Sequence, residues 1–149
     1  LPADTRLLVV GSGPERERLE QQAAALGVAE RVRFTGQVAN TELKWWYSAA
    51  DALLLCSSRE GWANVLLEAM ACGTPVIATN LWGTPEVVSR PEAGELMHER
   101  SPAGLAAAFE RLFERQPARD DVRRHAEDFS WAATTAGQLR LFRQVLGQS

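Results

Sequence analysis

The sequence has 149 residues, 46% of them hydrophobic and 23% charged, which fits one globular domain and excludes intrinsic disorder. The net charge of −3 excludes a global attraction to nucleic acid or to an anionic membrane surface. No apolar run reaches the roughly 20 residues that a membrane-spanning helix needs, and the first residues show no signal-peptide pattern. We therefore expect a soluble, cytoplasmic protein.

Apolar runs bounded by glycine or polar residues predict buried strands, and the segments between them predict helices. In chain order, we expect strands at residues 6–10, 31–35, 52–56, 75–79 and 95–98. We expect helices at residues 15–26, 41–49, 63–72, 102–115, 120–128 and 131–146. Strands joined by single helices predict an α/β domain whose parallel sheet is covered by helices on both faces. Glycines and polar residues gather at the carboxyl ends of these strands, the edge where such sheets bind ligands.

The cysteines and histidines predict no metal site. Cys56 and Cys72 lie inside apolar segments, so we expect two buried free thiols rather than a disulfide. His98 and His125 are the only histidines and lie far apart in the sequence, which favours two surface positions. Trp131, near the start of the last predicted helix, is expected in the core.

A glycine pair follows the first predicted strand. Gly11 and Gly13 can let the backbone approach a phosphate, and the helix after them favours an anion. The third glycine of the dinucleotide-binding pattern is missing, because Arg16 stands in its place. A plain turn between strand and helix explains the pair at least as well.

Two carboxylates flank the start of the predicted helix at residues 63–72. Glu60 lies in the loop before the helix, and Glu68 lies inside it. The free backbone N–H groups around Asn64–Leu66 would point outward from the helix start and can bind a diphosphate, while carboxylates accept hydrogen bonds from sugar hydroxyls. Apolar residues surround Glu68, so we expect it to be poorly solvated and to need a partner. The alternative is that Glu60 only favours the helix dipole and Glu68 is a solvated surface residue.

The spacing of this segment resembles a known family. Glu60, seven residues, Glu68 and then Ala-Met-Ala-Cys-Gly-Thr-Pro-Val-Ile-Ala-Thr is similar to the C-terminal domain of GT-B-fold, family-four retaining glycosyltransferases (glycosyl transferases group 1). The resemblance extends to residues 7–14, 32–36, 50–57 and 83–86, and so covers nearly the whole chain. It implies a three-layer Rossmann-like domain with C-terminal helices, forming one half of a GT-B fold.

The resemblance also implies roles for individual residues. Glu60 would bind the donor sugar as the catalytic residue, and Glu68 would bind the ribose. Backbone N–H groups would contact the sugar and diphosphate at Gly61, Trp62, Ala63, Asn64, Val65 and Leu66. The main chain of Gln37 and Val38 would hold the base, and Gly11 and Gly13 match the family's glycine turn. The family needs no metal and no cofactor here; the substrate would be a UDP- or GDP-sugar.

The chain departs from the family pattern in two ways. An Arg and a Lys that neutralise the diphosphate belong to an earlier region, so we expect residues 1–149 to be one domain lacking its first strand–helix unit and the N-terminal acceptor domain. Trp62 replaces the usual Phe or Tyr. The expected partners are the sugar donor and the missing domain, with no nucleic acid. Membrane contact would come only through the missing domain, at the inner face. A sugar-nucleotide epimerase and a non-enzymatic binding domain remain alternatives.

Overall fold

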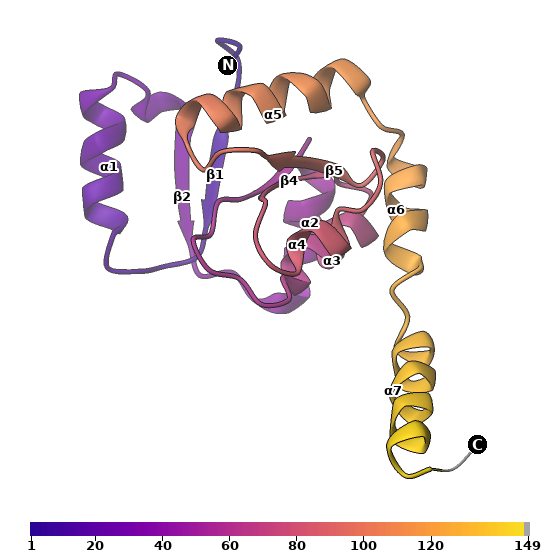
Figure 1. Cartoon of the computed structure of the whole chain (residues 1–149). Helices are drawn as coiled ribbons and strands as arrows, with labels where there is room; N and C mark the ends of the chain where they lie inside the picture. The colour runs from indigo at the N-terminus through magenta and orange to yellow at the C-terminus, as the bar shows by residue number, and fades with distance from the viewer. Residues whose placement is uncertain (148–149) are drawn as a thin grey trace. The chain divides into compact units, whose positions relative to one another are not determined.

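The computed structural model describes residues 1–147 (Figure 1). The chain divides into two compact units, Leu1–Trp46 and Tyr47–Ser149. No helix among the described residues is long and apolar enough to cross a membrane.

The first unit contains a two-stranded parallel sheet. Its elements are β1 (Leu7–Val10), α1 (Arg16–Ala25), the 3₁₀ turn η1 (Ala29–Arg31), β2 (Val32–Gly36) and most of α2 (Asn40–Ala49). β1 and β2 pair from Leu7 opposite Val32 to Val10 opposite Gly36. Among residues 1–46, all of which the structure describes, only Ala23 is buried. Two strands, helix α1, a short 3₁₀ turn and part of α2 cover little apolar surface, so this unit has almost no core of its own.

The second unit contains a three-stranded parallel sheet in the order β3-β4-β5. Its elements are β3 (Leu53–Leu55), α3 (Asn64–Ala71), β4 (Val76–Thr79), α4 (Thr84–Val87), β5 (Gly94–Met97), α5 (Pro102–Arg115), α6 (Arg119–Glu127) and α7 (Trp131–Val145). The central strand β4 is buried along its whole length. A strand buried on both faces reads as a continuous apolar run, which is how Val-Ile-Ala-Thr appears in the sequence.

Alternate residues of β4 point to the two sides of this sheet. Val76 and Ala78 belong to a core cluster with Leu66 of α3. Ile77 belongs to a second cluster with Leu112 of α5. Figure 1 accordingly shows α5 along one side of β4 and β5, with α3 on the other. The second unit is therefore a three-layer α/β structure, which confirms the predicted fold class.

A glycine at position 94 permits the close pairing of β5 with β4. The φ angle of Gly94 is +149°, and a Cβ atom built there would lie 2.0 Å from the carbonyl oxygen of Val76. No other residue type fits this position without moving the strand.

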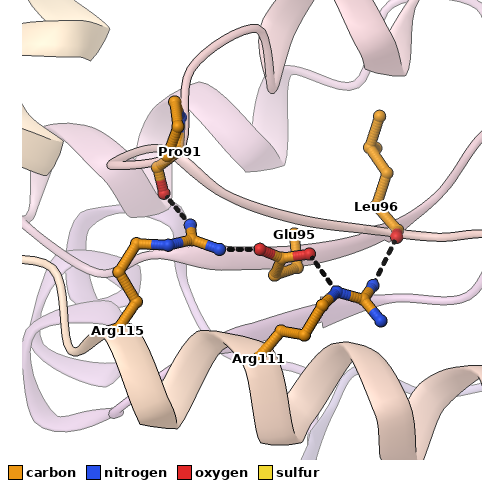
Figure 2. A network of polar contacts seen from close by, with 5 residues as sticks. All are labelled: Pro91, Glu95, Leu96, Arg111 and Arg115. Atoms are coloured by element: carbon orange, nitrogen blue, oxygen red, sulfur yellow. Dashed lines mark hydrogen bonds and ion pairs between the residues drawn. The ribbon is translucent and has the colours of Figure 1, made fainter.

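A partly buried carboxylate connects β5 to α5 (Figure 2). Glu95 receives a hydrogen bond from Arg111 Nε at 2.8 Å and another from Arg115, and its side chain is only 13% exposed. The two arginines also donate to the carbonyl oxygens of Leu96 and Pro91, respectively. Burial alone would raise the pKa of Glu95, but the hydrogen bonds from the arginines outweigh it and hold that pKa below its usual value.

Each predicted helix and strand agrees with the structure within two residues at each end, but four other differences remain. Residues 84–87, expected as loop, form the short helix α4, and the 3₁₀ turn η1 was not predicted. The strands form two ladders, one in each unit, rather than one continuous sheet. Trp131 was expected in the core but is 87% exposed, because it lies at the first position of α7, a helix whose Leu139, Leu141 and Phe142 are exposed as well.

Candidate functional site

The loop between β3 and α3 carries the first predicted carboxylate. Glu60 is half-buried, whereas Gly61 and Trp62 are exposed. Ala63 is buried and occupies the N-cap position of α3, where no side chain caps the helix. Side chains that normally satisfy the first N–H groups of a helix are therefore absent from this N-cap.

Of the N–H groups of Asn64, Val65 and Leu66 at the start of α3, the first and the third have local acceptors. The N–H of Asn64 donates to the carbonyl oxygen of Trp62 at 3.1 Å, and that of Leu66 donates to the carbonyl oxygen of Ala63 at 3.0 Å. The expectation that all three groups are free is wrong for these two, because the chain tightens into short turns as it enters the helix. Among the hydrogen bonds of the described residues, Val65 N–H has no acceptor.

The second predicted carboxylate has a side-chain partner. Glu68 Oε2 accepts a hydrogen bond from the hydroxyl of Tyr47 at 3.0 Å. Burial and then this bond raise the pKa of Tyr47 to about 12, so the phenol stays protonated and remains a donor at neutral pH. A partner for Glu68 was expected, but poor solvation was not correct: Glu68 is exposed, because its position on α3 faces outward while Leu66, Ala69 and Met70 are buried.

Tyr47 was not among the predicted site residues. It belongs to α2, whose carboxyl end is fixed by distant residues. Thr74 Oγ1 donates to the carbonyl oxygen of Tyr47 at 2.6 Å, and Arg119 donates to the carbonyl oxygens of Ser48 and Ala50 at 3.0 and 2.7 Å. The sequence predicts Tyr47 on one face of the helix at residues 41–49, together with Leu43 and Trp46, and offers no other signal for it.

The loop after β4 contacts the loop after β3. A Cβ atom at Gly83 would lie 2.5 Å from the carbonyl oxygen of Gly61 and 3.5 Å from Trp62 Cε3. Thr84 holds this turn to the end of β4, since its buried hydroxyl lies 2.7 Å from the carbonyl oxygens of both Thr79 and Leu81. The carboxyl ends of β3 and β4 therefore meet in one packed pair of loops.

The other predicted site residues belong to the first unit. Gly11 has a φ angle of +127°, and its N–H donates to the carbonyl oxygen of Gly36 at 2.8 Å, so that N–H already has an acceptor. Gly13 and Gln37 are exposed, and Val38 is half-buried. The structure thus brings together residues 60–68 within the second unit, and Gly11, Gly13, Gln37 and Val38 lie in the first.

Residues 2–129 match the family glycosyl transferases group 1. The chain belongs to this family. The resemblance to the C-terminal domain of GT-B glycosyltransferases is thereby confirmed.

Curated relatives of this glycosyltransferase chain include two D-inositol 3-phosphate glycosyltransferases. That of Frankia alni is 41% identical over 143 residues, which cover 91% of this chain and 35% of the relative. That of Streptomyces coelicolor is 39% identical over 135 residues, which cover 85% of this chain and 29% of the relative. The chain spans about a third of the length of the curated relatives that it matches.

Solved structures of glycosyltransferases share the fold. Sucrose-phosphate synthase from Thermosynechococcus elongatus has a TM-score of 0.79 and 33% identity, over 97% of this chain and 39% of that one. HepE of Anabaena, solved in complex with UDP-glucose, has a TM-score of 0.79 and 25% identity, over 97% of this chain and 42% of that one.

Neither described cavity of the glycosyltransferase chain contains a predicted site residue. The first, of about 430 Å³, lies in the first unit between α1 and β2 and is lined by Arg16, Glu20 and Phe34 among others. The second, of about 270 Å³, lies in the second unit beside Glu95 and Arg115.

The cysteines and histidines differ from their predicted environments. Both thiols are free, as expected, but Cys56 is exposed and Cys72 is half-buried, because each lies one residue beyond the end of its element. His98 is exposed as expected, whereas His125 is buried at 2% exposure. The described residues contain no group of three or more His, Cys, Asp or Glu side chains that could hold a metal ion.

Proposed function

We propose that this chain binds the nucleoside diphosphate sugar donor of a retaining glycosyltransferase. The observation that carries the proposal is the arrangement around α3. Half-buried Glu60 precedes the helix, Glu68 lies on its exposed side with one oxygen held by Tyr47, and the uncapped helix N-terminus lies between them. Family membership and the likeness to HepE with UDP-glucose support the same reading.

Each part of this arrangement suits a different part of the donor. Glu60 would accept hydrogen bonds from hydroxyls of the sugar, and Glu68 from hydroxyls of the ribose. The dipole of α3 and the N–H groups from Gly61 to Leu66, with Val65 N–H free of an internal acceptor, would lie against the diphosphate. Such contacts stabilise the negative charge that develops on the departing diphosphate.

The hydrogen bond from Tyr47 would prepare Glu68 for the ribose. Since Tyr47 donates to Oε2, the carboxylate is oriented while Oε1 remains able to accept a ribose hydroxyl. We favour UDP over GDP because UDP is the nucleotide in the related HepE complexes.

A whole enzyme of the length of the relatives would transfer the sugar to an acceptor. That acceptor would be held by a domain that corresponds to the part of the relatives outside the matched segment. The relatives are about three times as long as the matched segment, which leaves room for such a domain. We therefore expect weak donor binding and no turnover from this chain alone.

A titration tests the proposal directly. We expect UDP-glucose to bind this chain weakly when followed by NMR or calorimetry. Glu60→Gln should weaken UDP-glucose more than UMP, whereas Glu68→Gln should weaken both, because both carry ribose. Glu114→Gln, on an exposed position of α5, serves as the control. No binding of any nucleotide sugar at millimolar concentration would contradict the proposal.

A further inference from the structure

Trp62 is supported by an aromatic residue that lies 67 positions later in the sequence. The ring of Phe129, which follows α6, lies with its centroid 6.1 Å from that of Trp62 at an interplanar angle of 59°. Trp62 is 45% exposed, so it contacts Phe129 and still presents part of its ring to solvent. Tilted aromatic pairs at this separation are attractive.

Phe129 is in turn supported by a buried histidine. The ring of His125 lies edge-on to that of Phe129, with the centroids 5.4 Å apart. His125 Nε2 lies 2.8 Å from the carbonyl oxygen of Val87. Because a carbonyl oxygen only accepts, Nε2 carries the hydrogen, and this bond fixes the orientation of the imidazole. The second nitrogen, Nδ1, is buried without a partner among the described residues, so His125 has one polar contact rather than a network.

The same histidine connects the two supports of the loop. Val87 belongs to α4, which begins directly after Gly83, and Gly83 packs against the Gly61 carbonyl. The two supports are Gly83, which contacts the carbonyl oxygen of Gly61, and Phe129, which contacts the ring of Trp62. His125 bonds to Val87 of α4, the helix that follows Gly83, and its ring packs against Phe129.

This loop needs such supports because its own sequence gives it little rigidity. A Cβ atom at Gly61 would meet nothing within 4 Å, and the residue has the conformational freedom of glycine. No side chain caps the helix that follows. The position of Glu60 and of the neighbouring N–H groups is therefore set by what holds Trp62.

We propose that Phe129 and His125 are positioning residues that hold Trp62, and with it Glu60 and Gly61, in the arrangement that receives the sugar diphosphate. This inference rests on the proposed function for its ligand. It predicts that loosening Phe129 weakens the sugar and diphosphate contacts but leaves the ribose contact at Glu68 intact, because the partner that holds Glu68 is Tyr47 and not Phe129.

The test follows Trp62 and the ligand separately. The chain is labelled with 5-fluorotryptophan, and the fluorine resonance of Trp62 is assigned by its loss in Trp62→Phe. Phe129→Leu should shift that resonance and weaken UDP-glucose by about three- to tenfold, with a smaller effect on UMP. Phe129→Tyr keeps the ring and should restore both. His125→Gln, which keeps an amide donor for Val87, should shift the Trp62 resonance less than His125→Leu does.

Phe113→Leu is the matched control. It makes the same chemical change at a different aromatic pair, because Phe113 stacks on Phe109 within α5. It should leave the Trp62 resonance in place. A Trp62 resonance that does not move in Phe129→Leu overturns the inference, as does an equal loss of UMP and UDP-glucose. If the unaltered chain binds no nucleotide sugar, the proposed function fails; the fluorine shift still decides whether Phe129 positions Trp62.

Discussion

Tyr47 is the only tyrosine of the chain, and its hydroxyl donates to a carboxylate 21 residues later in the sequence. The bond gives an exposed glutamate a defined direction. A phenol suits this task because it stays neutral and keeps its proton where a histidine or lysine would change the charge of the pair. The partner of Glu68 is thus as much a part of the candidate site as Glu68 itself.

The ionisation of Tyr47 tests this pair. Because the chain has one tyrosine, the ultraviolet absorbance of phenolate reports Tyr47 alone, and we expect a pKa of about 12. The folded-state pKa is raised above 10.0, so the stabilising contribution is complete below that pH and is lost as the pH rises through 12.

Glu68→Gln provides the comparison. It removes the negative charge and the carboxylate acceptor but leaves the burial of Tyr47, so the pKa should fall while staying above its ordinary value. A tyrosine that titrates at 10.0 in the folded, unaltered chain would show that the bond is absent in solution.

The element on which each residue lies was predicted well where local sequence decides it. Glu60 in a loop and Glu68 on a helix follow from the turn residues and from the apolar run between them. The partnership of Tyr47 with Glu68 and the burial of His125 depend on packing between helices distant in sequence, which no local pattern encodes. The exposure of Cys56 turned on where a strand ends, and element boundaries are the least certain part of any sequence-based prediction.

At the scale of elements, strand β4 and helix α5 show what the sequence does encode. The apolar run of β4 and the spacing of Leu105, Phe109 and Leu112 were enough to place both elements. Helix α4 was missed because four residues after a glycine and including a proline carry no helical period. Its Pro85 lies near the start of the helix, where the missing N–H is harmless.

The contact between the loops after β3 and β4 predicts the effect of Gly83→Ala. The φ angle of Gly83 is −76°, so the backbone itself accepts alanine, and the cost comes from the Cβ atom 2.5 Å from the Gly61 carbonyl. We expect the free energy of unfolding in urea to fall by about 1–3 kcal/mol.

Gly137→Ala is the contrasting control. A Cβ atom at Gly137 meets nothing within 4 Å, and the residue lies inside α7, so alanine should leave stability unchanged or raise it by up to about 1 kcal/mol. If both variants behave alike, steric packing at Gly83 is not the reason for the glycine.

The link between β5 and α5 predicts a pH-dependent effect of Glu95→Gln. At neutral pH the variant should lose about 1–3 kcal/mol of unfolding free energy, because two arginines lose a charged acceptor. The pKa of Glu95 is lowered in the folded chain, so its contribution is present above the unfolded carboxyl pKa and is lost as the pH falls through the folded one. The gap between variant and unaltered chain should therefore close in acid, measured by urea unfolding at several pH values.

Glu114→Gln on the exposed side of α5 provides the matched comparison and should leave stability nearly unchanged at every pH. A gap at Glu95 that persists unchanged in acid would mean that packing, rather than charge, is what the substitution removes.

At the scale of the whole molecule, the two units differ in how much core each contains. The second unit holds two clusters of buried side chains around β4, whereas the first has Ala23 as its only buried residue. The family resemblance came from motifs of both units, because a motif is fixed by short-range turns and strands. The division into two units was not predicted, since it depends on which strands share hydrogen bonds.

Hydrogen exchange tests this difference. We expect amide protons of β4 to exchange far more slowly than those of β1, whose Leu7, Leu8 and Val10 are all exposed. Mass spectrometry of peptides covering the two strands measures the ratio. Equal protection of β1 and β4 would contradict this expectation, because it would mean that the β1 amides are shielded from solvent as well as those of β4.

The bonds from Arg119 to the carbonyl oxygens of Ser48, near the end of α2, and of Ala50, just beyond it, bear on the order in which the chain assembles. They join residues 69 and 71 positions apart, so the carboxyl end of α2 gains this arginine cap only after α6 has arrived. Bringing the two ends of so long a segment together costs chain entropy, and the bonds from Arg119 stabilise α2 only after that cost has been offset by other contacts. During synthesis, the bonds from Arg119 to Ser48 and Ala50, the neighbours of Tyr47, can form only when some seventy further residues have left the ribosome, so we expect this end of α2 to be fixed late.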